Sequence, residues 1–136
     1  MGGFHSANPT TGQVWARMPQ ATGSDVDHAV RAAERAFNTG PWAGMTQSQR
    51  GTCLRRLAEL LAERLEELGR TETMDTGKLL KETRWQARYI AAFFQLYAGC
   101  ADKIRGETLP IDQRDMFVFT RREQLGAVAA IVPSNS

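Results

Sequence analysis

The stretch Gly126-Ala127-Val128-Ala129-Ala130-Ile131-Val132-Pro133-Ser134-Asn135 decides the fold of this chain. Its apolar run is unbroken, begins after a glycine and is closed by a proline, a pattern typical of a strand that is buried on both faces. Such strands belong to parallel sheets covered by helices on both sides. A parallel strand needs a neighbour, which only a long crossover can supply. We therefore expect this chain to be the front part of a larger α/β enzyme.

Upstream of this stretch the sequence predicts helices. Ser24, followed by acidic residues, marks the start of a helix that Gly40-Pro41 ends. Thr46-Gln47-Ser48-Gln49 forms a capping box for a second helix, whose leucine stripe continues to a C-terminal glycine, Gly77. A third helix is predicted over residues 80–104.

The third helix has a wide aromatic face. Trp85, Tyr89, Phe93 and Tyr97 follow each other at intervals of four residues, so they share one side of the helix. This face predicts burial against a substantial partner surface. The alternative is that the aromatic side chains line a substrate entrance in a whole enzyme.

Two segments predict short strands. Residues 13–18 alternate apolar and polar side chains, as in a half-buried strand. Residues 108–122 predict a hairpin with a polar turn at residues 112–115, and its second arm carries apolar side chains on both faces. Because an isolated hairpin is only marginally stable, we expect it to pack on something outside this chain.

The composition indicates an ordinary soluble globular protein, with 42% hydrophobic and 24% charged residues and a formal net charge of +2. Interleaved charges argue against a nucleic-acid partner, and no apolar run is long enough to predict a membrane span. Cys53 and Cys100 both fall in helical patterns, which predicts buried structural thiols and a cytoplasmic location. His5 and His28 have no metal-ligand spacing, so no metal site is expected.

A set of short motifs runs in order through nearly the whole chain. They are Asn8-Pro9-Thr10-Thr11-Gly12, Asp27-Ala29-Val30-Ala32-Ala33-Ala36-Phe37, Trp42, Arg50 with Leu54, Leu57 and Leu61, Glu72-Thr73-Met74-Asp75-Thr76-Gly77-Lys78 with Glu82, Tyr97-Ala98-Gly99 with Asp102-Lys103 and Gly106, and residues 126–135. In this set the chain resembles the N-terminal portion of the NAD(P)-dependent aldehyde dehydrogenase superfamily.

The resemblance implies an incomplete α/β fold of the aldehyde dehydrogenase type. Residues 1–106 would be the helical front of a Rossmann-like cofactor-binding domain. Residues 107–124 would be a β-hairpin of the oligomerisation arm, and residues 125–136 the first central strand of the cofactor sheet, truncated.

The resemblance also implies the chemistry of the whole enzyme, an oxidoreductase that oxidises an aldehyde to a carboxylic acid with NAD or NADP through a cysteine thiohemiacetal. The family's Pro-Trp-Asn occurs here as Pro133-Ser134-Asn135, so Asn135 takes the position of the oxyanion donor. By itself, an asparagine after a proline is more often an ordinary turn residue. Ile131, Val132, Pro133 and Ser134 would border the cofactor, and Ser134 replaces the usual tryptophan.

No catalytic cysteine motif occurs in this sequence, so we expect the isolated 136-residue chain to be inactive. The partners implied by the resemblance are an aldehyde substrate in the complete enzyme and further copies of the chain, in a homo-oligomer (dimer or tetramer) held through the 107–124 hairpin. The alternative is a non-catalytic helical interaction or oligomerisation module derived from the same family.

Overall fold

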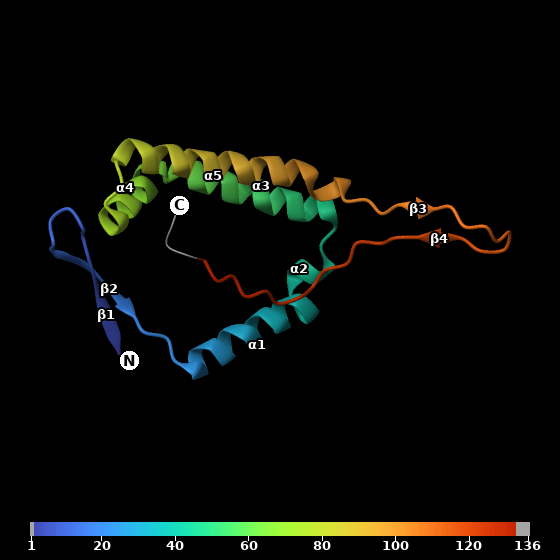
Figure 1. The fold of residues 1–136 in the computed structure, drawn as a ribbon, viewed down its shortest axis with the longest axis horizontal. Coiled ribbons are helices and arrows are strands. Elements are labelled where there is room, and N and C mark those ends of the chain that lie inside the picture. Colours follow the sequence, from blue (N-terminus) through green and yellow to red (C-terminus); the bar gives the residue numbers. More distant parts are fainter. Residues whose placement is uncertain (1, 133–136) are drawn as a thin grey trace.

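The computed structural model describes residues 2–132. Its elements, in chain order, are β1 (Gly3–Ala7), β2 (Val14–Pro19), α1 (Gly23–Thr39), α2 (Pro41–Gly44), α3 (Gln47–Glu63), α4 (Leu65–Thr76), α5 (Leu80–Cys100), the 3₁₀ helix η1 (Ala101–Lys103), β3 (Thr108–Leu109) and β4 (Val118–Phe119) (Figure 1).

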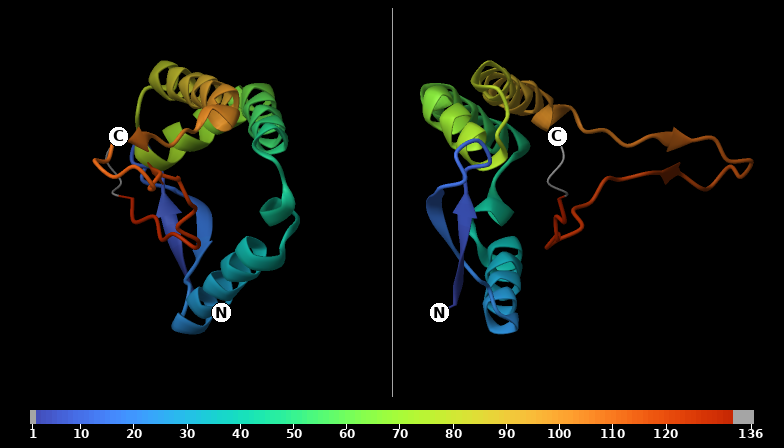
Figure 2. Two further views of the ribbon diagram at one scale, coloured as in Figure 1. Left: turned by 90° about the vertical axis from the view of Figure 1, so that its right-hand side faces the viewer. Right: turned by 60° about the vertical axis from the view of Figure 1, so that its left-hand side comes forward.

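The elements form an open ring from which one hairpin projects. The α3 and α5 helices lie side by side, with α4 across one end of the pair, and α1 lies on the opposite side of the ring (Figures 1 and 2). The β1–β2 hairpin closes the ring at one end and α2 at the other, while β3 and β4 extend away from it. This architecture, mainly helical with two small pairs of antiparallel strands, agrees with an incomplete α/β fold.

Helix boundaries follow the capping chemistry of the sequence. The capping box at Thr46 is confirmed, because its hydroxyl accepts from the Gln49 amide and the Gln49 side chain accepts from the Thr46 amide. Gly77 ends α4 in the left-handed conformation, with φ of 77°. The predicted N-cap at Ser24 was wrong: α1 begins after Thr22, whose side chain and backbone pair with Asp25.

The α3–α5 pair is held by small residues that allow the two backbones to approach closely. A Cβ atom added to Gly51 would lie 2.7 Å from the Ala98 carbonyl oxygen, so this glycine is required by the contact. In the described part of the chain the buried apolar residues are all alanines: Ala58, Ala87, Ala91 and Ala98. The second predicted helix is interrupted at Arg64, where α4 turns away from α3.

A strand over residues 3–7 was not predicted from the sequence. It pairs antiparallel with β2, and Phe4 lies opposite Met18. The hairpin is tied to the end of α4 because the Ser6 hydroxyl donates to Asp75 Oδ1 at 2.6 Å. The same hydroxyl accepts from Trp15 Nε1 of β2 at 3.2 Å, a bond within the hairpin.

The second hairpin forms as predicted, although its paired part is short. Thr108 lies opposite Phe119 and Leu109 opposite Val118. After the hairpin, residues 127–132 lie in no strand, and none of the described strands pairs with them. A strand needs a hydrogen-bonded neighbour, so the expectation that this segment is the first central strand of a cofactor sheet stays a prediction.

Burial differs from the sequence-based expectation at the cysteine residues. No described residue covers the aromatic face of α5, since Trp85 is 62% exposed and Tyr89, Phe93 and Tyr97 are exposed as well, so burial of this face against a partner surface stays a prediction. Cys53 and Cys100 are also exposed free thiols rather than buried ones. The apolar stripes of the helices are therefore partly exposed to solvent, and no described residue covers the aromatic part of α5.

Candidate functional site

The residues predicted to form the site lie at the end of the chain and are only partly described. Pro133, Ser134 and Asn135 lie outside the described residues. Ile131 and Val132 are 94% and 81% exposed, so their side chains pack against nothing in the described part. The structure therefore does not bring the predicted site residues together.

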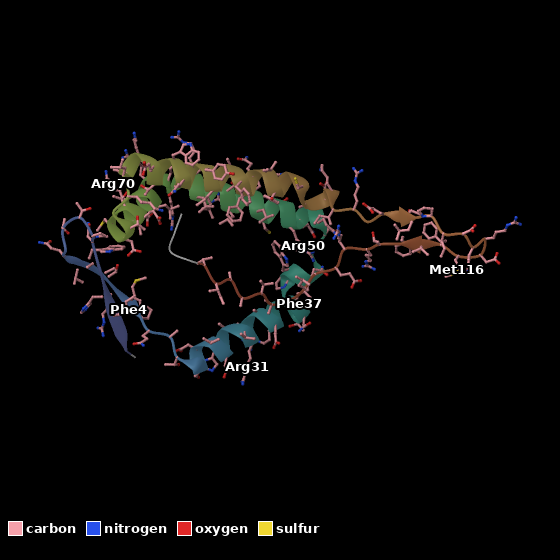
Figure 3. The ribbon with its side chains drawn as sticks, viewed as in Figure 1. Phe4, Arg31, Phe37, Arg50, Arg70 and Met116 are labelled. Carbon is pink, nitrogen blue, oxygen red and sulfur yellow. The ribbon has the colours of Figure 1, made fainter. Side chains whose placement is uncertain are left out.

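The segment that leads to this site is placed by α1. Gly126 has φ of 103°, a left-handed value that favours glycine, and a Cβ atom added to it would lie 3.8 Å from the Phe37 ring. Phe37 is at the end of α1 that faces α2 (Figure 3). The chain turns here after leaving the hairpin.

The backbone N–H and C=O groups of the segment that leads to Ile131 and Val132 have no backbone partners among the described residues. No backbone hydrogen bond joins residues 121–132 to another described residue. The place of Ile131 and Val132 along NAD(P) stays a prediction.

Arg50, at the start of α3, holds the junction with α2. Its guanidinium donates to the Trp42 carbonyl oxygen through Nε at 3.3 Å and Nη2 at 3.1 Å, and lies 5.7 Å from the centre of the Trp42 ring. Figure 3 shows Arg50 on the inner side of this junction. Both residues belong to the motif set quoted above.

A cavity of about 770 Å³ lies between this junction, the end of α5 and the base of the β3–β4 hairpin. Its apolar lining includes Trp42, Leu54, Tyr97 and Ile104. Its charged lining consists of Arg50, Arg105, Arg121, Arg122 and Glu123. We call it the basic cavity.

The basic cavity was not predicted from the sequence. The adjacent Arg121 and Arg122, directly after the apolar arm of the hairpin, were the available signal. Of these two, Arg121 approaches Glu123 at 4.0 Å, while Arg122 forms no ion pair with any described residue. The cavity can therefore accept negative charge.

A second hollow, of about 480 Å³, lies between α4 and α5. Leu68, Tyr89 and Ile90 contribute its apolar wall, and Glu72 and Thr83 its polar one. The Thr83 hydroxyl is already used, because it lies 2.8 Å from the Thr73 hydroxyl and donates to the Leu80 carbonyl. This hollow carries no unpaired reactive group among the described residues.

The residues with perturbed pKa values line neither hollow. The hydrogen bond from the Thr22 side chain, together with that from its backbone amide, lowers the pKa of Asp25. The hydrogen bond from Lys103, with its positive charge, lowers the pKa of Asp102, and Glu59 with Glu63 raises the pKa of Arg56. All three stabilise the charged form of a surface residue.

Residues 2–132 offer neither a metal centre nor a membrane span. No group of three or more His, Cys, Asp or Glu side chains in this range is arranged to hold a metal ion. In the same range, none of the helices combines the length and apolar character that crossing a membrane requires.

Known proteins match the chain over nearly its whole length. A dehydrogenase of Acinetobacter baylyi that acts on (Z)-2-((N-methylformamido)methylene)-5-hydroxybutyrolactone is 49% identical over 133 residues, which cover 98% of this chain and 27% of the relative. Aldehyde dehydrogenase family 2 member C4 of Arabidopsis thaliana is 38% identical and is covered over 26% of its length.

The fold matches solved enzymes in the same way. The NAD⁺ complex of an aldehyde dehydrogenase from Bacillus cereus has a TM-score of 0.83 at 37% identity, over 88% of this chain and 24% of that one. The chain thus spans about a quarter of the length of the relatives it matches. The sequence profile of the aldehyde dehydrogenase family matches residues 2–136, and the chain therefore belongs to that family.

Proposed function

We propose that this chain is the front part of an aldehyde dehydrogenase that oxidises an aldehyde to a carboxylic acid with NAD or NADP. The observation that carries the proposal is the match of residues 2–136 to the family, together with relatives that are dehydrogenases. The NAD⁺ complex of the Bacillus cereus relative supports the choice of cofactor. We place the enzyme in the cytoplasm.

In this proposal residues 1–106 support the cofactor-binding domain, residues 107–124 form an arm for association with a second copy, and residues 125–136 enter the cofactor sheet. The exposed arm supports the second assignment, since Phe117 is 73% exposed and Met116 lies near its far end (Figure 3).

The chemistry assigns one direct role to this chain. The side-chain amide of Asn135 donates a hydrogen bond to the oxygen that becomes negative when a cysteine thiolate adds to the aldehyde carbonyl. When bound, NAD(P)⁺ supplies the hydride acceptor. Ile131, Val132, Pro133 and Ser134 border it and hold its position. The thiolate comes from outside these residues, so the isolated chain is inactive.

Fragment complementation tests this proposal. The chain is expressed alone and together with the remaining three quarters of the Acinetobacter baylyi relative, and NADH formation is measured with a panel of aldehydes. We expect activity only from the pair. In the pair, Asn135→Ala should lower turnover roughly 10²–10³-fold, as expected for loss of one oxyanion donor, while Ser136→Ala serves as the control.

Two outcomes would contradict the proposal. NADH formation by the chain alone would refute the assignment of the thiolate to another segment. A soluble, defined pair that forms no NADH with any aldehyde would favour the alternative, a non-catalytic helical interaction module. Ser134→Trp, which restores the family's residue, should tighten cofactor binding in the pair if this position borders the cofactor.

A further inference from the structure

Two hydrogen bonds close the base of the β3–β4 hairpin beside the basic cavity. The Thr120 amide donates to the Glu107 carbonyl oxygen at 2.8 Å, and the Glu107 amide donates to the Thr120 hydroxyl at 2.8 Å. A Cβ atom added to Gly106 would collide with the Thr120 carbonyl oxygen, so the close approach of the two chain segments depends on this glycine. The residues just before Gly106 and just after Thr120 are therefore held next to each other.

Four guanidinium groups reach the basic cavity from segments far apart in the sequence. Arg105 comes from the segment that enters the hairpin, Arg121 and Arg122 from the segment that leaves it, and Arg50 from the start of α3 (Figure 3). Among the described lining residues only Glu123 is acidic, so four arginines against one glutamate give a formal charge of +3. Neither Arg105 nor Arg122 forms an ion pair with a described residue. Most of this positive charge is thus free to meet an anion.

The rest of the lining is largely apolar. Leu54, Tyr97, Ile104 and Phe119 contribute to it, and Ile104 is 68% exposed. The volume of about 770 Å³ falls within the range of about 300–1,000 Å³ that is usual for small-molecule sites. Such sites combine apolar walls with a few polar groups that fix the orientation of the ligand. A ligand that suits this cavity therefore has an apolar body as well as negative charge.

The amount of charge favours a phosphate group over a carboxylate. A carboxylate carries one negative charge, which a single guanidinium satisfies through two parallel hydrogen bonds. A phosphate monoester carries about −1.5 to −2 charges at neutral pH and has three acceptor oxygens. Arg105, Arg121 and Arg122 together match this charge and these acceptors.

We propose that the basic cavity binds a small phosphate monoester with an apolar body. Arg105, Arg121 and Arg122 hold the phosphate group, and Tyr97 and Ile104 pack against the body. This site goes beyond the proposed dehydrogenase function, since none of these five residues takes part in the oxidation of an aldehyde.

Calorimetric titration of the 136-residue chain with phenyl phosphate tests the proposal. Inorganic phosphate supplies the charge without the ring, phenol the ring without the charge, and benzoate the ring with a single negative charge. We expect phenyl phosphate to bind at least about tenfold more tightly than each of these three probes, because it alone uses both the arginines and the apolar wall.

Two double variants separate the site from the overall charge of the chain. Arg105→Gln with Arg122→Gln removes two donors from the cavity and should weaken the binding of phenyl phosphate at least about tenfold. Arg55→Gln with Arg88→Gln removes the same charge from exposed positions outside the lining and should weaken it by no more than about twofold in physiological salt. Circular dichroism should show unaltered helix content in both variants, because all four side chains are exposed.

The two cysteines show where the ligand binds. Cys100 lines the basic cavity and Cys53 does not, while both thiols are exposed. Saturating phenyl phosphate should slow the alkylation of Cys100 by iodoacetamide several-fold and leave that of Cys53 unchanged, as measured by mass spectrometry of the two peptides.

The opposite results overturn the proposal. Equal binding of phenyl phosphate and inorganic phosphate would show that the apolar wall takes no part, and equal binding of benzoate would show that a phosphate group is not preferred. The site is also refuted if the two double variants weaken binding equally, if Cys100 is not protected, or if phenyl phosphate does not bind. None of these outcomes bears on the proposed dehydrogenase function.

Discussion

Gly51 is the residue on which the helix pair depends most directly. The nearest atom to a Cβ added there is a backbone oxygen, that of Ala98, which cannot move without shifting α5. We therefore expect Gly51→Ala to lower the free energy of unfolding by about 1–3 kcal/mol, as overpacking does in tightly packed interiors. Urea unfolding followed by circular dichroism measures this change.

The chain supplies its own control at Gly99, a helical glycine with no atom within 4 Å of an added Cβ. Gly99→Ala should raise the free energy of unfolding by about 0.5–1 kcal/mol, because alanine restricts the unfolded chain and favours the helix. Equal effects of the two substitutions would show that α3 and α5 do not approach as closely as described.

Asp25 makes the start of α1 sensitive to acid. Its Oδ2 accepts from the Thr22 amide at 2.8 Å and from the Thr22 hydroxyl at 2.7 Å, and these bonds lower its pKa below the ordinary 3.8. The carboxylate therefore stabilises α1 at any pH above 3.8, and this contribution is lost as the pH falls through the lower folded-state value.

Titration of the Asp25 carboxyl by NMR tests this dependence. Thr22→Ala removes the hydroxyl donor, so the pKa of Asp25 should move up toward 3.8. Thr39→Ala removes a hydroxyl at the far end of the same helix and should have no effect. A Thr22→Ala variant with an unchanged titration would contradict the capping contact.

At the scale of elements, the N-terminal hairpin depends on one hydroxyl group. Ser6 joins Trp15 and Asp75, and no other side-chain hydrogen bond in the described residues links β1 or β2 to a helix. Ser6→Ala should speed backbone hydrogen exchange in residues 3–7 about fivefold, the effect of losing roughly 1 kcal/mol of local stability. Thr52→Ala, on the outer face of α3, should leave this exchange unchanged.

The elements that sequence predicts well are those with local causes. The capping box at Thr46 and the left-handed Gly77 depend on residues within a few positions, and both are where the sequence places them. The strand over 3–7 has no such signal, since Gly-Phe-His-Ser lacks a clear alternation and becomes a strand by pairing with β2. The bend at Arg64 has no signal either, because the leucine stripe continues across it.

Burial could not be predicted from helical periodicity, because a stripe shows which side chains share a face but not what covers them. Cys53 and Cys100 lie in periodic segments and are nevertheless exposed. The site residues could not be predicted from a local pattern either. Asn135 was identified by resemblance alone, and its role depends on a cysteine thiolate and a cofactor that the described residues do not supply.

At the scale of the whole molecule, the ring of helices buries little and leaves its largest side chains uncovered. The α5 aromatic residues contact each other, with ring centres 4.5 Å apart for Phe93 and Tyr97, yet remain exposed. Exposed apolar surface of this kind is typical of faces that contact another protein or a ligand. The aromatic face of α5 should accordingly contribute little to the free energy of unfolding of this chain.

We therefore expect Tyr89→Gln with Phe93→Gln to change the free energy of unfolding by no more than about 1 kcal/mol, since both are surface positions and glutamine is a good helix former. Truncation of a buried aromatic residue costs about 3–5 kcal/mol. The same variant should bind less of a hydrophobic fluorescent dye. Urea unfolding and dye titration distinguish the two cases. If the variant loses several kcal/mol of unfolding free energy, α5 packs through its aromatic face within this chain. The aromatic face is then not available to another protein surface.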